Sequence, residues 1–344
     1  MKKIFKVFFS FFLLSFFPLV ADIGYQQGYA LSQDDLLEGY NLSLLESKSK
    51  DTNISLGASF IFWAPVEEGT AFSIYDETNV NKVAGRVNHV DDPYQPGFKI
   101  FGFVEAGADS DQTLVEYIHH HSTQYGRAQG PPAGLGYLKP LWLTDGGNVT
   151  YAKGKFKVHY DRINCMFGRN AFFGKRLLIK PSFGLSYFFI KQKFTARYTI
   201  DNTDIFSYNS STAWAIGPRG GVFFDFNILK YCSIIGFGHT SLVFQDLRSE
   251  TKQQDKDNYP SYLVKARENP YQVTPDVDLS TGIKISNLLS DDAFGFDFLV
   301  TYDFTYIWNQ NVMREIKDFR STLQNERRGN LMFHGLTLSF GLEF

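Results

Sequence analysis

The feature that most constrains the fold is a stretch of 16 residues, 293–308, in which apolar and polar side chains alternate. Every second residue from Phe294 to Trp308 is apolar or aromatic, and Asp297 and Asp303 stand among the residues between them. A period of two is typical of a β-strand with two different faces. Globular strands average ~5–6 residues, whereas a tilted membrane strand needs ~9–11 and can project beyond the bilayer. The stretch therefore predicts a membrane-spanning strand.

The same alternation recurs along the chain and predicts ten strands. They cover residues 53–63, 97–107, 112–121, 152–164, 174–198, 212–228, 231–247, 275–287, 293–308 and 330–344. The connections between them are alternately short and long, with long ones at 64–96, 122–151, 199–211, 248–274 and 309–329. Short periplasmic turns and long outer loops are typical of bacterial outer-membrane barrels. We predict an all-β fold, a transmembrane antiparallel β-barrel of about ten strands; residues 70–75 offer a further strand, so twelve are also allowed.

The composition agrees with a barrel and excludes several other classes of protein. Aromatic residues make up 17% of the chain, with 35 Phe, a proportion that suits a lipid-facing wall. The 34 Lys and Arg are balanced by 36 Asp and Glu, so the chain has no basic footprint for nucleic acid. Two cysteines, Cys165 and Cys232, are too few for a disulfide scaffold. We expect inert thiols there, and cross-linking between chains is the lesser alternative.

The two ends of the chain carry processing and assembly signals. Residues 1–21 combine three lysines, an apolar run and a small residue, Ala21, which is the layout of a secretory signal peptide. Residues 22–50 show no alternation, and we expect a periplasmic or lumen-entering segment ahead of a barrel over 51–344. Phe340, Leu342 and the terminal Phe344 share one strand face and resemble the signal that the barrel assembly machinery reads. The predicted location is the bacterial outer membrane, reached through the periplasm.

Strand parity predicts which charged side chains line the lumen. The predicted lining residues are Lys99, Lys155, Lys157, His159, Asp161, Arg176, Lys180, Arg219, Asp278, Lys284, Asp297 and Asp303. Glu105, Asp225, Asp276 and Glu343 share this face, which makes cations and anions nearly balanced. Buried charges must pair or stay hydrated. The balance permits either a salt-bridged plug or a polar channel with little charge selectivity.

Two histidine motifs could carry chemistry. His239 and Ser241 stand two apart on one strand face, as the base and nucleophile of outer-membrane phospholipase do. His119 and His121 also share a face and could bind a metal, but the sequence offers no third ligand at a readable spacing. We predict no catalytic residue, no metal and no cofactor.

Several segments, in order along the chain, carry a resemblance to a known family. They are Phe62-Trp63-Ala64, Gly97-Phe98-Lys99, Lys180-Pro181-Ser182, Gly217-Pro218-Arg219, Trp308-Asn309-Gln310 and His334-Gly335-Leu336. Together they resemble the Legionella- and chlamydia-type major outer membrane proteins. The resemblance covers residue 57 to the end and implies a pore-forming barrel in the outer membrane.

The sequence thus favours a porin-like protein that lets small hydrophilic solutes diffuse passively. One alternative is a structural or adhesive surface barrel with a plugged lumen, and a third is an outer-membrane hydrolase. The expected partners are outer-membrane lipid, the assembly machinery and small hydrophilic solutes, with no nucleic acid; a homo-oligomer is left open.

Overall fold

The computed structural model describes residues 52–76, 85–106, 111–130, 136–143, 149–173, 176–200, 202–229, 231–255, 264–289, 294–315, 325–326 and 329–343. The predicted signal peptide, the segment 22–50 and Phe344 lie outside these residues. Among the described residues, no helix has the length and apolar character needed to cross a membrane.

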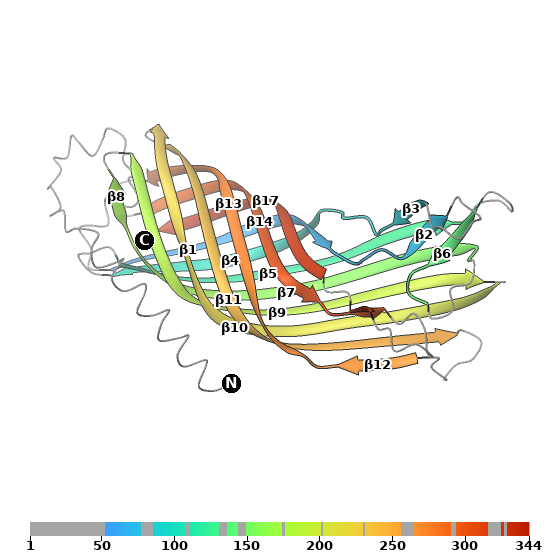
Figure 1. Cartoon of the computed structure of the whole chain (residues 1–344). Coiled ribbons are helices and arrows are strands. Elements are labelled where there is room, and N and C mark those ends of the chain that lie inside the picture. Colours follow the sequence, from blue (N-terminus) through green and yellow to red (C-terminus); the bar gives the residue numbers. More distant parts are fainter. Residues whose placement is uncertain are drawn as a thin grey trace, which may run out of the picture. The chain divides into compact units, whose positions relative to one another are not determined.

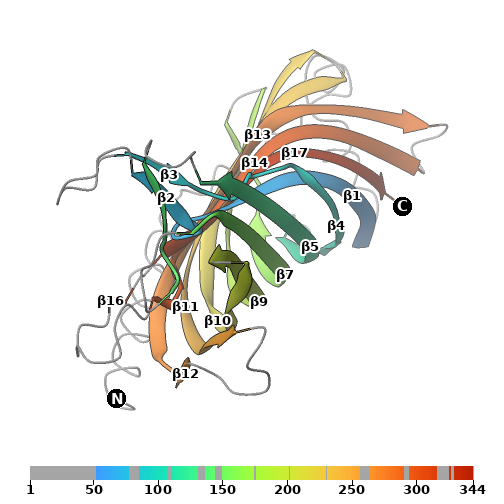
Figure 2. The same cartoon turned by 90° about the vertical axis from the view of Figure 1, so that its right-hand side faces the viewer.

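Ten long antiparallel strands form a closed barrel (Figures 1 and 2). They are β1 (Thr52–Glu67), β4 (Gln95–Ala106), β5 (Asp111–Gln129), β7 (Tyr151–Arg169), β9 (Leu177–Ile200), β10 (Thr203–Leu229), β11 (Cys232–Asp255), β13 (Tyr271–Leu289), β14 (Phe294–Asn311) and β17 (Gly329–Glu343). Each strand pairs with the next, and β17 closes the barrel on β1, from Ser55 opposite Glu343 to Glu67 opposite Leu331. Closure leaves no unpaired sheet edge, as a membrane span requires. The predicted fold and strand number are confirmed.

Shorter strands decorate the barrel. β2 (Ser73–Asp76), β3 (Gly85–Asn88) and β6 (Tyr137–Pro140) form a separate three-stranded sheet at the end away from the C-terminus (Figure 1). β8 (Ala171–Phe173) pairs with β9, β12 (Val264–Glu268) pairs with β11, and β15 (Arg314–Glu315) pairs with β16 (Asn325–Glu326). The further strand expected at 70–75 therefore corresponds to β2, which is not a wall strand, so the barrel does not reach twelve.

The long connection predicted at 199–211 is wrong. β9 and β10 continue side by side to Ile200 and Thr203, and the chain reverses through Asn202, whose φ is 65°. Asn tolerates this left-handed conformation better than most residues. Polar inward side chains misled the sequence analysis, because Ser207, Asn209 and Ser211 are all buried inside the barrel. Three wall strands run well beyond their predicted limits: β5 ends at Gln129 instead of 121, β10 begins at Thr203 instead of 212, and β11 ends at Asp255 instead of 247.

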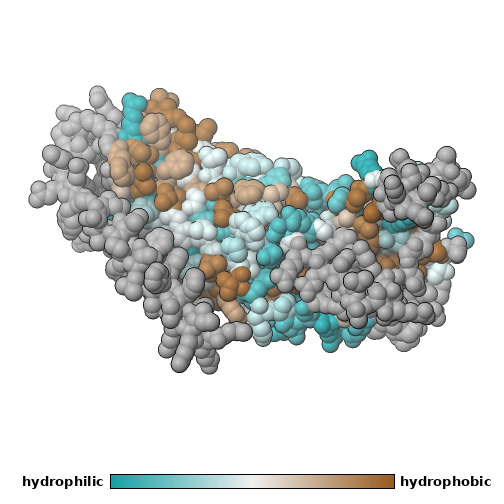
Figure 3. Space-filling view, in the orientation of Figure 1, coloured by the Kyte–Doolittle hydropathy of each residue, from teal (hydrophilic) through white to brown (hydrophobic). Residues whose placement is uncertain are grey.

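The two faces of the wall exchange character along the strands. Near the short turns, Phe183 and Leu185 of β9 point outward and are more than half exposed, as expected for a lipid-facing belt. Further along the same strand, Phe188 and Phe194 point inward and are fully buried, while Lys191 points outward. Figure 3 shows apolar side chains gathered toward the end where the chain's C-terminus lies and more polar ones toward the β12 end. The barrel is therefore lipid-adapted in one part and packed like a water-soluble protein in the other.

This assignment predicts that two neighbouring substitutions on β14 differ in effect. Phe298 points outward within the apolar belt, and Leu299 points into the barrel cavity. Phe298→Arg should destabilise the assembled barrel by about 2–4 kcal/mol, because a lipid-facing arginine loses its hydration. Leu299→Arg should be milder, since an inward guanidinium reaches water and acidic neighbours. Comparing the folded fractions on unheated gels tests the difference, and equal damage would contradict the orientation.

Candidate site: the barrel interior

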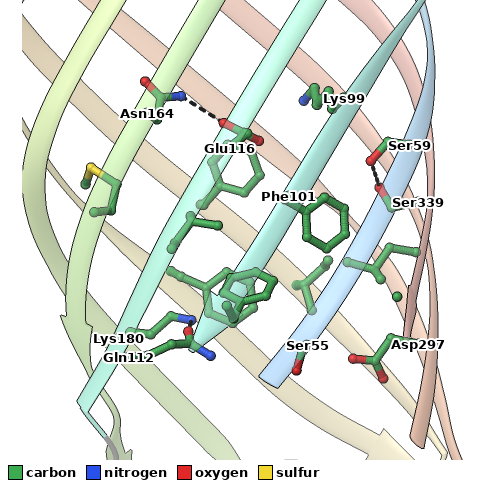
Figure 4. Close-up of a pocket in the computed structure, with 18 of the residues that line it drawn as sticks. Ser55, Ser59, Lys99, Phe101, Gln112, Glu116, Asn164, Lys180, Asp297 and Ser339 are labelled. Carbon is green, nitrogen blue, oxygen red and sulfur yellow. Dashed lines mark hydrogen bonds between the residues drawn. The ribbon is translucent and has the colours of Figure 1, made fainter. Parts of the chain in front are cut away.

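The part of the lumen nearest the short turns contains a cavity of about 250 Å³, lined by charged and polar side chains together with aromatic ones such as Phe101 (Figure 4). Its lining includes Lys180 and Asp297, together with uncharged groups such as Ser55. Asn164 of β7 donates a hydrogen bond of 2.8 Å to Glu116 of β5, and Ser59 of β1 bonds Ser339 of β17 at 2.8 Å. These contacts run between neighbouring strands, so they stiffen the wall without filling the cavity.

Above this cavity, the Arg162 guanidinium crosses the lumen. Arg162 is on β7, and its Nη2 lies 2.8 Å from Asp276 while its Nη1 lies 3.0 Å from Asp278, both on β13. β7 and β13 are separated by β9, β10 and β11 on one side and by five strands on the other. The contact therefore joins nearly opposite walls.

Neighbouring side chains satisfy the remaining hydrogen bonds of this cluster. The Arg162 Nε donates to Asn164 at 3.0 Å and to Ser186 at 2.9 Å. Arg219 of β10 adds a second cation, 2.6 Å from Asp278, and both guanidinium groups donate to the Ser241 hydroxyl. All of these charged groups are buried or nearly so. Pairing offsets the cost of taking them out of water.

Three lysines form further links inside the lumen. Lys99 of β4 lies 2.6 Å from Asp303 of β14 and 4.7 Å from the Trp63 ring centroid. Lys284 of β13 pairs with Asp225 of β10. Lys180 bonds Gln112 of β5. Most of the charged groups named in the lumen are thus paired with a group of opposite charge.

An aromatic layer lies inside the barrel on the outer side of the ion pairs. Tyr160 of β7 stacks on Phe333 of β17, with ring centroids 4.7 Å apart. Trp63 and His120 pack around Phe333 at centroid distances of 6.2 and 5.6 Å. β7 and β17 are separated by β5, β4 and β1, so this stack also spans the barrel. Tyr160 and Phe333 are 0% and 1% exposed, which means that solvent does not pass between them.

The three-stranded sheet and the segment after it complete the core of the outer part. Phe72, which precedes β2, is fully buried, and its carbonyl accepts a hydrogen bond of 2.5 Å from the Tyr198 hydroxyl of β9. Trp142, which follows β6, donates from Nε1 to the Ala71 carbonyl at 2.7 Å. Gln192 of β9 reaches across to Glu67 of β1 at 2.8 Å. The outer interior is therefore a packed core rather than a channel.

Seven predicted lumen residues do lie on the inward face. They are Lys99, Lys180, Arg219, Asp278, Lys284, Asp297 and Asp303.

The other five residues predicted to line the lumen do not lie there in the structure. Lys155, Lys157, His159 and Asp161 of β7 point outward, and Phe156, Val158 and Tyr160 between them are fully buried. The prediction assumes that lipid surrounds this segment of the wall, whereas the segment lies beyond the apolar belt and has water outside it. Arg176 is exposed in the turn before β9 and does not line the lumen.

Arg162, which contacts two carboxylates across the lumen, is not among the predicted lumen residues. A signal was available, because Ile163 and Phe167 of the same strand are outward-facing and apolar. Their parity places Arg162 and Asn164 inside.

The proposed pairing of His239 with Ser241 is not formed. The Ser241 hydroxyl donates to Asp276 at 3.1 Å and accepts from the two guanidinium groups, while His239 Nε2 lies 3.3 Å from Ser182. The serine therefore has no histidine base. Cys165 on β7 and Cys232 on β11 are both free thiols, so they do not pair within the chain.

His119 does not pair with His121, as a metal site predicted from the sequence would require; it lies instead beside Asp161 and His159. His119 Nδ1 lies 2.8 Å from one oxygen of Asp161, and His159 Nε2 lies 2.6 Å from the other. Ligand atoms of these three residues all lie within 4.8 Å of one another on the outer face. Imidazole and carboxylate groups are suitable for a divalent transition metal, although Asp161 already satisfies both rings by hydrogen bonding.

The closed antiparallel wall, its apolar belt and its ion-paired interior define a bacterial outer-membrane β-barrel. A family model described as the Legionella pneumophila major outer membrane protein precursor matches residues 48–344, and the chain belongs to this family. None of the curated proteins matches the chain in sequence.

Solved outer-membrane barrels are similar to the chain only at low scores. The outer membrane protease OmpT from Escherichia coli is 8% identical, with 85% of this chain and 96% of that chain covered and a TM-score of 0.41. A major outer membrane protein from Thermus thermophilus is 10% identical, with 86% and 100% covered and a TM-score of 0.29. The Pseudomonas putida toluene transporter TodX is 8% identical, with 92% and 94% covered and a TM-score of 0.28. Their functions carry no argument for this chain.

The cross-lumen contact predicts a large stability loss on removing Arg162. Arg162→Leu leaves two buried carboxylates with one guanidinium, which should cost about 3–5 kcal/mol of folding free energy. The matched control is Arg248→Leu, since Arg248 is 70% exposed and its ion pair with Asp246 should contribute at most ~1 kcal/mol. The temperature at which the folded gel band disappears measures both. Similar temperatures for the two variants would contradict a structural role for Arg162.

Proposed function

We propose that the protein is a structural surface barrel of the outer membrane whose lumen is closed by its own side chains. The observation that carries this proposal is the double crossing of the lumen by Arg162 with Asp276 and Asp278, and by Tyr160 with Phe333. Both crossings join nearly opposite strands, so together they obstruct a solute at two successive levels. The proposal includes export with a cleaved signal peptide and insertion by the assembly machinery.

The outer part of the barrel supports a role at the cell surface. β9, β10 and β11 contain 24, 27 and 24 residues, whereas ~9–11 residues cross a bilayer. Because its interior is a packed core, this part presents a stable surface to the outside. A structural or adhesive role needs such a surface and does not need an open channel.

Passive diffusion of small hydrophilic solutes is the second candidate. It is favoured by the cavity of about 250 Å³ beneath the ion pairs, whose lining includes the charged side chains of Lys180 and Asp297 on the periplasmic side. Conduction would require the Arg162 cluster and the aromatic layer to separate. A hydrolase is disfavoured, because Ser241 is hydrogen-bonded to Asp276 and has no histidine base.

Single-channel recording of refolded protein in planar bilayers distinguishes a closed barrel from a pore. The wild-type protein should give a folded band on unheated gels and no discrete conductance steps. The variant Arg162→Ala/Tyr160→Ala/Phe333→Ala should give steps, because it removes both crossings. Regular steps from the wild-type protein would overturn the closed-barrel proposal in favour of the porin.

A matched control separates lumen opening from general damage to the wall. Phe333 and Phe340 are on the same strand, but Phe333 is buried in the lumen and Phe340 is half exposed toward lipid. Phe340→Ala removes the same atoms from the outer face and should leave the protein silent. If the triple variant does not fold, Phe333→Ala with Arg162→Lys offers a milder opening to be measured in the same way.

A further inference from the structure

The outward face of β5, β7 and β9 carries a dense group of cations beyond the apolar belt. We call this group the basic patch; it consists of Arg127, Lys153, Lys155, Lys157, Lys191, Lys193 and Arg197. All seven side chains are at least partly exposed. Arg197 pairs with Asp204 at 2.7 Å. For the other six, no carboxylate partner occurs in the described part of the chain.

Cross-strand register brings like charges of the patch together. Lys157 is directly opposite Lys193, and Lys153 is opposite both Arg197 and Arg127. Like charges directly opposite each other on one sheet face are destabilising. The wall contains three such contacts close together, so an anion bound between the cations would increase the stability of the fold.

Among the described residues, the side chains next to the lysines do not provide that anion. The β10 residues opposite the two β9 lysines are neutral, with Thr212 opposite Lys191 and Ser210 opposite Lys193; the one acid on this row of β10, Asp204, is paired with Arg197. Within the patch, the Lys155 Nζ lies 5.2 Å from the centroid of the Tyr125 ring, so this neighbour offers a cation–π contact and no negative charge. The positive charge of most of the patch is therefore exposed to solvent and is not neutralised by a described carboxylate.

The position of the patch indicates what the anion is. On β9, the outward row runs Leu185, Tyr187, Phe189, Lys191 and Lys193, so the first lysine follows the lipid-facing row by two residues. Two residues of strand span ~7 Å. Lysine side chains can also reach toward the membrane surface. The patch thus begins where the headgroups of the outer leaflet begin, on the side of the long loops.

We infer that the basic patch binds the phosphate groups of the glycolipid, lipopolysaccharide, that forms the outer leaflet. Phosphates bridge several ammonium groups at once, which relieves the repulsion between Lys157 and Lys193. Tyr125 beside Lys155 offers a flat face for a sugar ring. The inference is independent of whether the lumen conducts.

The test uses full-length refolded barrel in zwitterionic detergent, titrated with lipopolysaccharide. The variant Lys155→Gln/Lys157→Gln/Lys191→Gln/Lys193→Gln should bind about tenfold or more weakly, because each lysine near an anionic surface contributes to attraction. The control variant Arg248→Gln/Lys252→Gln/Lys265→Gln/Arg267→Gln removes as many charges from β11, β12 and their connections and should bind like wild type. Equal binding by both variants would overturn the inference.

Other anions distinguish the glycolipid from alternative sources of phosphate. Lipopolysaccharide stripped of its phosphates should bind wild-type protein weakly. Saturation by millimolar inorganic phosphate, or equally tight binding to phosphatidylglycerol vesicles, would overturn the assignment to the glycolipid.

Thermal unfolding provides a second measurement, because the variant and the wild type should differ in opposite directions with and without lipopolysaccharide. Without lipopolysaccharide, the four-lysine variant should unfold at the same or a higher temperature than wild type, since repulsion is removed. With lipopolysaccharide, only wild type and the control should gain several degrees. If the four-lysine variant does not fold, Lys157→Gln/Lys193→Gln offers the same comparison, and a gain in that variant equal to wild type would contradict the inference.

Discussion

The buried Arg162 guanidinium determines how the two sides of this barrel are placed relative to each other. A ten-strand wall could enclose water, but Arg162 draws β7 and β13 together through two carboxylates. Buried ion pairs often contribute little net stability compared with an apolar replacement, whereas breaking one is costly. The cluster is therefore better understood as a device that fixes geometry. Tyr160 of the same strand, two residues before Arg162, stacks on Phe333 of β17, so β7 contacts the far side of the barrel at two successive levels.

The exchange of faces along the strands follows from the change of solvent. In the belt, lipid lies outside, so Phe183 and Phe298 point outward while Asp303 is paired within the lumen. Beyond the belt, water lies outside, and Phe156 and Phe188 turn inward. On β7, buried and more exposed residues alternate from Tyr151 to Phe167, through both parts. What changes is the identity of the residues on each face, and this change marks the outer edge of the membrane on the wall.

The same exchange explains which parts of the structure the sequence could predict. Alternation around Phe298 identified the wall and its parity, because the outer solvent there is lipid. The prediction that Lys155 and Lys157 line the lumen is wrong, because alternation alone does not show which face of a strand is in contact with water. Ser207 and Asn209 hid the continuation of β10, because small polar residues facing a core look like a loop. The cross-lumen contacts of Arg162 depend on the register of strands far apart in sequence, which a local pattern does not contain.

The long outer part of β7 and β9 has a consequence for how the molecule is made. Its lysines reach the outside only by crossing a hydrocarbon layer of ~30 Å, in which ionised side chains are unfavourable. An interior still open to water would offer these lysines a hydrated route during insertion. Once Arg162 joins β13 and Tyr160 meets Phe333, that route is obstructed. The outer segments should therefore cross the membrane before Arg162 contacts β13 and Tyr160 contacts Phe333. These contacts across the lumen should then form at the last stage of biogenesis.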